Sequence, residues 1–393
     1  MKFILIGMML SGMNDQNPFH FGSLALDAAF TDRAEERAEL VSDIRNGQDV
    51  VIFAPRRLGK SSLAWSAIQA LAAEGVLVAQ VDLMTTPTKE RLASALAKTI
   101  FEQIASPLER VKERALAPFR SLLVQPTVTV DPQDGSFSFS FAFGRSAGDI
   151  DATLERLLQL PAELGAARDR RTALVMDEFQ EIVEIDPRLP NLLRAVFQQQ
   201  PEVAHVYLGS RKHVMERIFN DRNQPFWRSA KLVELGPIDS ASFEAFLLER
   251  FRGTGRMLAP EVAAALLERT GGHPYATQEL AYALWEQIPE GREATADHLE
   301  DALAAVLRSE HAHFSLLWEE ASAVQRLVLQ ALASEPGRPF QAEYRTRHEL
   351  PPATNVQKAL AALEKREVVA GENGAYRIAE PFLAEWLNPQ SRP

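Results

Sequence analysis

The chain has 393 residues, of which 46% are hydrophobic and 24% are charged, as in an ordinary globular protein of two or three domains. Its net charge of −11 disfavours a general attraction to nucleic acid or to anionic membranes, although a local basic patch is compatible with it. Because the sequence has no cysteine, disulfides, thiolate zinc sites and a cysteine nucleophile are excluded, and a cytoplasmic location is expected.

Residues 1–16 are expected to form an N-terminal extension. Their short apolar run follows a single lysine and precedes no clear cleavage site, which disfavours a signal peptide. We expect the folded chain to begin near Met13. No stretch approaches the roughly 18 apolar residues of a membrane span, so no membrane partner is expected.

Between residues 17 and 236, strand patterns alternate with helical patterns, which predicts parallel β-α-β units in one α/β sheet. The expected strands are 49–54, 76–83, 172–179, 205–211 and 231–235, and the expected helices are 33–46, 60–74, 88–104, 106–123, 150–164 and 188–199. A β-hairpin insertion is expected at about 125–144, because residues on both sides of a turn alternate in polarity. Its four phenylalanines either pack on the same domain or contact a partner.

The rest of the chain has a helical pattern, with one short hairpin near its end. Helices are expected at 240–251, 260–270, 275–288, 295–308, 312–319, 322–334, 340–348 and 352–366. A hairpin is expected over 368–378. Helices followed by a small hairpin are typical of a winged-helix domain, which we place at 310–393.

The most specific motif directly follows the first expected strand. It fits the GxxxxGK[ST] pattern of a phosphate-binding loop, with Ala54 in place of the first glycine. In such a loop, backbone N–H groups surround a phosphate, Lys60 places a charge beside the β and γ oxygens, and the Ser61 hydroxyl binds Mg²⁺. The candidate nucleotide-binding residues are Ala54, Pro55, Arg56, Arg57, Leu58, Gly59, Lys60, Ser61 and Ser62.

A second motif, four apolar residues followed by Asp177 and Glu178, ends the third expected strand. The carboxyl ends of parallel strands form the ligand-binding edge of an open sheet. Asp177 is expected to hold Mg²⁺ through water, and Glu178 to activate the attacking water as a general base. In this order along the chain, the two motifs predict a site for ATP or ADP with Mg²⁺, in which Lys60 and Glu178 are catalytic.

Ser210 and Arg211 lie at the end of the fourth expected strand and are further catalytic candidates. They could sense the γ-phosphate or neutralise charge that develops during phosphoryl transfer. The alternative is that they only solvate the surface. Arg222 and Arg228 precede the last strand, where an arginine could reach a neighbouring subunit.

Four other residues are candidates for contacts with the nucleotide. His273 and Pro274 follow two glycines, and they either face the phosphates and adenine or simply begin a helix. Phe30 and Arg33 are candidates for the adenine end of the site.

Together, these motifs resemble the prokaryotic AAA+/STAND-type P-loop ATPases of the archaeal-ATPase group. The matching segments are Asn17-Pro18-Phe19, Phe30 to Glu36, Ala54 to Leu63, Asp177-Glu178-Phe179-Gln180, Gly209-Ser210, Gly271-Gly272-His273-Pro274 and Pro381 to Leu387. The resemblance implies a core at 17–236 with strand order 5-1-4-3-2, a helical lid at 237–309 and nucleotide held between them. It also implies switching between ADP and ATP states, often with oligomerisation.

The chain departs from this group in two places. Ala54 replaces a loop glycine, which we expect to be tolerated if its φ is negative. After Arg33, the acidic residue of the family pattern is shifted or duplicated, as Glu35 and Glu36. Since the sequence ends at the winged helix, whereas many relatives continue into a further domain, we expect any effector to be a separate protein.

The expected function is that of a slow, Mg²⁺-dependent ATPase that switches conformation and controls a homo-oligomer or a separate effector. One alternative is a DNA-binding regulator or initiator-like loader that uses the winged helix. Another is an interaction scaffold that holds ADP or ATP without hydrolysing it.

Overall fold

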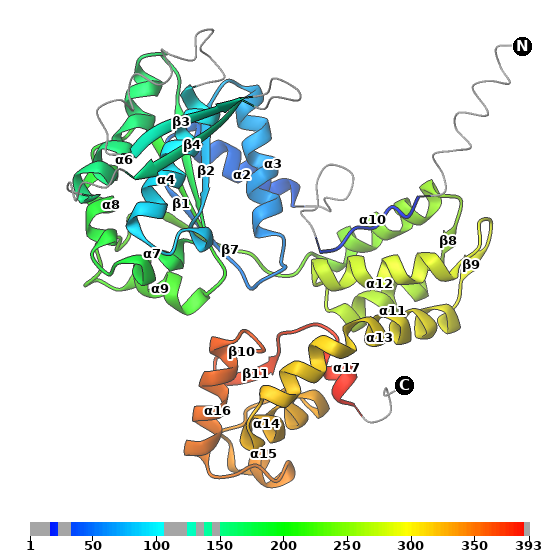
Figure 1. The fold of residues 1–393 in the computed structure, drawn as a ribbon. Helices are drawn as coiled ribbons and strands as arrows, with labels where there is room; N and C mark the ends of the chain where they lie inside the picture. Colours follow the sequence, from blue (N-terminus) through cyan, green and yellow to red (C-terminus); the bar gives the residue numbers. More distant parts are fainter. Residues whose placement is uncertain (1–15, 23–32, 106–123, 131–136, 144–149, 389–393) are drawn as a thin grey trace, which may run out of the picture. The chain divides into compact units, whose positions relative to one another are not determined.

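The computed structural model describes residues 16–22, 33–105, 124–130, 137–143 and 150–388, with only the backbone for 124–130 and 137–143 (Figure 1). Residues 1–15 of the expected N-terminal extension, Phe30 and the helix expected at 106–123 lie outside these ranges. The chain divides into two compact units. We call Arg33–Pro55 with Lys60–Gly236 the sheet unit, and the remainder, which includes Arg56–Gly59, the helical unit.

A five-stranded parallel sheet in the order β2-β5-β6-β1-β7 forms the centre of the sheet unit. Its strands are β1 (Val50–Phe53), β2 (Leu77–Asp82), β5 (Thr172–Asp177), β6 (Val203–Gly209) and β7 (Lys231–Glu234). Numbered by position along the chain, these strands have the expected order 5-1-4-3-2. The α/β P-loop fold class is therefore confirmed.

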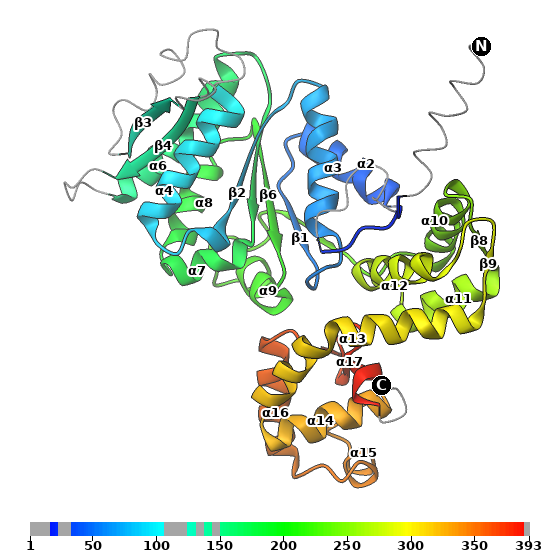
Figure 2. The same cartoon turned by 45° about the vertical axis from the view of Figure 1, so that its right-hand side comes forward.

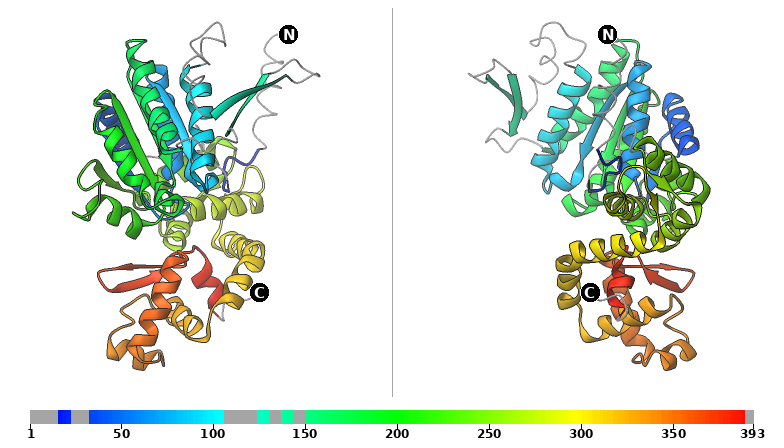
Figure 3. Two further views of the ribbon diagram at one scale, coloured as in Figure 1. Left: turned by 60° about the vertical axis from the view of Figure 1, so that its left-hand side comes forward. Right: turned by 90° about the vertical axis from the view of Figure 1, so that its right-hand side faces the viewer.

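Helices cover both faces of this sheet, as the figures show from several sides (Figures 1–3). One face is covered by α2 (Ala34–Arg45) and α3 (Lys60–Ala73), and the other by α4 (Lys89–Ile100), α6 (Ile150–Ala166) and α8 (Leu189–Phe197). Because both faces are covered, the central strands are apolar without alternation, and every residue of β1 and β6 is buried. The remaining short elements are η2 (Leu83–Thr85), η3 (Phe101–Ala105), η6 (Phe179–Glu181), α7 (Ile182–Ile185) and α9 (Lys212–Asn220).

The expected hairpin consists of β3 (Val124–Val130) and β4 (Phe137–Phe143), which pair antiparallel with Val124 opposite Phe143. The side chains of these strands and the turn between them lie outside the described part of the chain. The role expected for the four phenylalanines therefore stays a prediction.

The helical unit packs around one apolar core that includes residues from both of its ends. Its elements are α10 (Ser240–Gly253), β8 (Met257–Leu258), α11 (Pro260–Thr270), α12 (Pro274–Gln287), β9 (Glu293–Ala294), α13 (Ala296–Glu320), α14 (Ala323–Ser334), α15 (Ala342–Arg347), α16 (Ala353–Lys365), β10 (Val369–Glu372), β11 (Ala375–Ile378) and α17 (Leu383–Leu387). The antiparallel β10–β11 pair forms the expected wing. Of the helices in the described ranges, none is long and apolar enough to cross a membrane.

The prediction of separate helices at 295–308 and 312–319 is wrong, because α13 is continuous over 25 residues. A capping box made by Thr295 and His298 begins this helix. Neither glycine nor proline follows before residue 320, so nothing in the sequence interrupts the hydrogen-bond ladder.

The turn before α12 contains two glycines with positive φ, Gly271 at 57° and Gly272 at 67°. The Gly272 carbonyl accepts a hydrogen bond from the Ile238 N–H at 3.1 Å. A Cβ at Gly272 would lie 2.7 Å from the Ile238 carbonyl oxygen, whereas a Cβ at Gly271 would meet nothing within 4 Å. The two positions share a backbone requirement but differ in available space.

This difference predicts unequal effects of alanine substitution. Gly271→Ala should lower the free energy of unfolding by about 1 kcal/mol, the usual cost of a left-handed residue. Gly272→Ala should lower it by about 3 kcal/mol, because a backbone clash is added to that cost. Denaturant titration of both variants measures the difference, and equal effects would contradict the packing described here.

Candidate functional site

The phosphate-binding loop runs from the end of β1 to the start of α3, so its last residues lie at a helix N-terminus. Ala54 is buried, and its N–H donates to the Gly209 carbonyl at 3.2 Å, which ties the loop to the end of β6. Positive φ values in the loop occur at Arg57 (64°) and Gly59 (83°), and not at Ala54. Ala54 therefore needs no glycine-only conformation, as expected.

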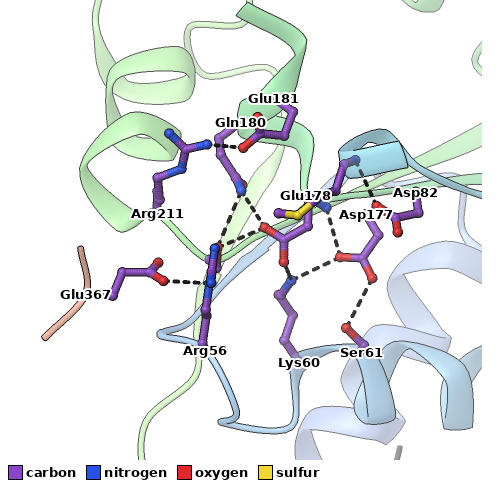
Figure 4. Close-up of polar contacts among 12 residues, drawn as sticks. Arg56, Lys60, Ser61, Asp82, Asp177, Glu178, Gln180, Glu181, Arg211 and Glu367 are labelled. Atoms are coloured by element: carbon purple, nitrogen blue, oxygen red, sulfur yellow. Dashed lines mark hydrogen bonds and ion pairs between the residues drawn. The ribbon is translucent and has the colours of Figure 1, made fainter. Parts of the chain in front are cut away.

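Lys60 is the centre of a compact polar cluster at the carboxyl edge of the sheet (Figure 4). Its Nζ lies 3.0 Å from Asp177 Oδ1 and 3.0 Å from Glu178 Oε1, and its side chain is only 7% exposed. The Ser61 hydroxyl donates to Asp177 Oδ2 at 3.1 Å. The structure thus brings together the candidates from the two separate motifs.

Glu178 is held by contacts on both of its carboxylate oxygens. Its Oε2 accepts hydrogen bonds from the Ser210 hydroxyl at 2.8 Å and from the Gln180 amide. Burial acts to raise the pKa of Glu178, but the charge of Lys60 and the hydrogen bonds from Gln180, Lys60 and Ser210 together lower it below its usual value. The side chain is therefore an ionised, oriented carboxylate at neutral pH.

Two members of the cluster, Asp82 and Gln180, were not among the predicted site residues. Asp82 ends β2 directly opposite Asp177 in the strand register. Burial raises the pKa of Asp82, and the nearby charges of Asp177 and Glu178 raise it further, whereas a hydrogen bond from the Met84 N–H and the charge of Lys60 lower it. Its position at a strand end, and the position of Gln180 two residues after Glu178, are the sequence signals that could have identified them.

Gly209 allows the close packing around Gln180. A Cβ at residue 209 would lie 2.5 Å from the Met215 sulfur and 2.9 Å from Gln180 Oε1. A larger residue at the end of β6 would therefore displace the amide that holds Glu178.

Other candidates in the sheet unit have contacts of their own. Arg211 pairs with Glu181, and among the described contacts it makes no hydrogen bond to the Lys60 cluster (Figure 4). Arg33 is buried, and its guanidinium donates to the Gly236 carbonyl at 2.7 Å and pairs with Glu36 at 3.2 Å. Arg33 thus connects the start of α2 to the segment that follows β7. Ser62 is buried in the first turn of α3.

The remaining loop candidates belong to the helical unit. Arg56 pairs with Glu367 at 2.6 Å, and Arg57 pairs with Glu380 at 2.9 Å. Pro55, in the sheet unit, is exposed, whereas Leu58 is buried. In this structure the two arginine side chains contact protein carboxylates.

His273 and Pro274 begin α12, as the simpler of the two interpretations predicted. Pro274 occupies the first helical position, and His273 Nδ1 accepts from the Ala276 N–H at 3.4 Å. Burial, reinforced by the positive charge of Arg57, lowers the pKa of His273 to about 4. The imidazole is therefore a neutral helix cap at physiological pH.

The donor set of the Lys60 cluster fits a nucleotide phosphate and Mg²⁺. An ammonium group beside backbone N–H groups at a helix N-terminus is a phosphate-binding arrangement. A hydroxyl and a carboxylate in contact, Ser61 and Asp177, are oxygen ligands of the kind that Mg²⁺ prefers. Among the described residues, no three histidine or acidic side chains form a metal site by themselves.

The pKa of His273 predicts a pH dependence of stability. His273 gains a proton near pH 6.5 in the unfolded chain but only near pH 4 in the folded chain. The contribution of neutral His273 to the free energy of unfolding is therefore complete above about pH 6.5 and is lost as the pH falls from 6.5 to 4. His273→Asn keeps a capping oxygen but cannot titrate. Between pH 7.5 and pH 5, the wild type should lose about 2 kcal/mol more than this variant in denaturant titrations. Replacing the exposed His213 by asparagine is the control, and equal losses in wild type and His273→Asn would contradict the prediction.

Comparisons with known proteins agree with this architecture. Residues 312–389 match a family described as "Probable winged helix domain". No curated protein matches the chain. A Walker-type ATPase of Pyrococcus abyssi is similar in structure, with a TM-score of 0.64, 18% identity and coverage of 95% of this chain and 99% of that one. The ORC2 protein of Aeropyrum pernix, solved as ADPNP–ADP complexes, has a TM-score of 0.56, 16% identity and coverage of 95% and 96%. The chain therefore has the fold of a P-loop ATPase of the AAA+ type with a C-terminal winged-helix domain.

Proposed function

We propose that this protein binds ATP and hydrolyses it slowly with Mg²⁺, and that it acts as a conformational switch. The observation that best supports this function is the position of Lys60 Nζ, 3.0 Å from the carboxylates of both Asp177 and Glu178. In this proposal Lys60 is the phosphate-binding cation, Asp177 the metal-binding carboxylate and Glu178 the general base, and their proximity at the sheet edge supports these roles.

In this proposal each residue of the site has a separate role. When a nucleotide is bound, Lys60 would contact its phosphate oxygens, and Ser61 and Asp177 would hold Mg²⁺, which would neutralise phosphate charge. Glu178 then accepts a proton from water through Oε1, while Ser210 and Gln180 fix its Oε2. The lowered pKa of Glu178 keeps this base ionised at neutral pH.

Ser210 and Gln180 are suited to transmit the state of the site. They link the end of β6 to Glu178, and their amide and hydroxyl contact each other at 3.4 Å. A bound γ-phosphate would redistribute these hydrogen bonds, and its loss would restore them. We propose that this change acts on a second copy of the chain or on a separate effector in the cytoplasm.

Glu178→Gln should separate nucleotide binding from hydrolysis. Without a general base, Mg²⁺-dependent ATP hydrolysis should fall about 100-fold, while ATP affinity measured by calorimetry should change little. Glu184→Gln changes the same charge on an exposed residue of α7 and should retain full activity. Hydrolysis that survives Glu178→Gln would contradict the assignment of the base, and a wild type that binds tightly without turnover would favour the scaffold alternative.

DNA binding through the winged helix is the second candidate function. Helix α16 exposes Thr354, Asn355, Gln357 and Lys358, and no acidic residue lies between Ala353 and Leu363. Neutral hydrogen-bonding side chains with a cation are suited to a nucleic-acid groove. The net charge of −11 for the whole chain limits this contact to a local one.

Lys358→Glu tests this candidate directly. If α16 contacts DNA, the variant should lose the salt-dependent gel shift of a duplex, and the slope of log affinity against log salt should fall by about 1. Replacing Lys98 of α4 by glutamate changes charge equally on another helix and is the matched control. An absence of any shift with the wild type would exclude this function.

A further inference from the structure

Glu279 is a buried carboxyl group of the helical unit that the candidate site does not use. It lies in the middle of α12, and the residue is only 3% exposed. Its Oε2 is buried and has no hydrogen-bond partner in the described part of the chain. A carboxylate in this environment would be an incompletely compensated buried charge, which is strongly unfavourable. Glu279 therefore requires either a dedicated cation or a proton of its own.

Arg57 of the phosphate-binding loop acts electrostatically on Glu279 but is engaged by other residues. Its guanidinium pairs with Glu380 at 2.9 Å and lies over the Tyr275 ring, 4.4 Å from the ring centroid. Among the described hydrogen bonds and ion pairs, none joins Arg57 to Glu279. Arg57 is therefore not a dedicated cation for the buried carboxyl group.

Glu310 of α13 supplies an acceptor for a proton on Glu279. A hydrogen bond joins the two carboxyl groups, and such a bond forms only if one of them is protonated. Burial and the negative charge of Glu310 raise the pKa of Glu279 to about 8, against the opposing charge of Arg57. At neutral pH, Glu279 is therefore a neutral acid that donates to Glu310.

Other titratable groups surround this pair. Burial raises the pKa of Glu380, and the charge of Glu310 raises it further. The charges of Arg57 and His313 lower it. Tyr275, one turn before Glu279 on α12, is neutral because burial raises its pKa to about 12. In this group of residues, Arg57 therefore supplies the positive charge that persists across the whole pH range.

We propose that Glu279 is a pH-sensitive switch that controls how firmly the helical unit holds Arg57 of the phosphate-binding loop. With a proton on Glu279, Arg57 is held by Glu380 and by the Tyr275 ring. Loss of the proton adds a carboxylate charge that attracts the guanidinium, so the hold becomes tighter as the pH rises. The coupling is reciprocal, since withdrawal of Arg57 raises the proton affinity of Glu279.

The buried proton gives the pH dependence of stability a definite sign. The pKa of Glu279 is raised from 4.5 to about 8 on folding, so its contribution to stability is complete below about pH 4.5 and is lost as the pH rises through 8. Glu279→Gln keeps a neutral donor but cannot titrate. Relative to this variant, the folding equilibrium constant of the wild type should fall at least about tenfold between pH 6 and pH 8 in denaturant titrations.

Glu268→Gln, at an exposed position of α11, is the matched control and should keep the wild-type pH dependence. The same pH dependence in the wild type and in Glu279→Gln would overturn the proposal.

A double-mutant cycle with Arg57→Gln tests the switch without any readout of ATP hydrolysis. At pH 9, removal of the guanidinium should enlarge the loss caused by Glu279 about threefold, because the ionised carboxylate then lacks its cation. At pH 6, where Glu279 is neutral, the two substitutions should act independently. A coupling that is absent at both pH values, or equal at both, would overturn the proposal.

Glu310→Gln tests where the proton is held. This substitution removes a negative charge and a charged acceptor beside Glu279, so the loss of stability between pH 6 and pH 8 should shrink about threefold. An unchanged loss would overturn the assignment of the proton to the pair of Glu279 and Glu310.

Discussion

The contact of Lys60 with two carboxylates is the constraint on which the candidate site depends. Asp177 and Glu178 are adjacent at the end of β5, where partial burial strengthens their mutual repulsion. The Lys60 ammonium group lies 3.0 Å from each carboxylate, and its positive charge offsets this repulsion. Because Lys60 belongs to the loop after β1, this contact requires β1 and β5 to end at the same edge of the sheet.

The strand between them completes the site. β6 lies between β5 and β1 and ends in Gly209, which ties to the loop through Ala54 and leaves space for Gln180. Ser210 follows immediately and donates to Glu178. Three adjacent parallel strands thus position Lys60, Glu178 and the two side chains that hold Glu178. A different strand order would separate these groups, so the geometry of the site depends on the order of the strands in the sheet.

The helical unit has a different organisation, in which a continuous helix replaces a sheet as the common element. The 25 residues of α13 contribute to a single apolar core together with α12 and the helices of the winged-helix domain. The segment around Phe19 is also part of this core, and its ring packs against Phe251. The helices of this unit and the segment around Phe19 therefore share one packed core.

The sequence by itself determined the features that depend only on residues close together in the chain. The loop from Ala54 to Ser62, the acidic pair after β5, the hairpin of the winged helix and the start of α12 at Pro274 are all local, because each arises from turn, cap or strand-end preferences of neighbouring residues. The tertiary structure alone decided which of these segments meet. It placed Ser210 on Glu178, paired Arg211 with Glu181 and joined Arg33 to Gly236. These contacts join residues distant in the chain through strand order and helix packing, which no local pattern specifies.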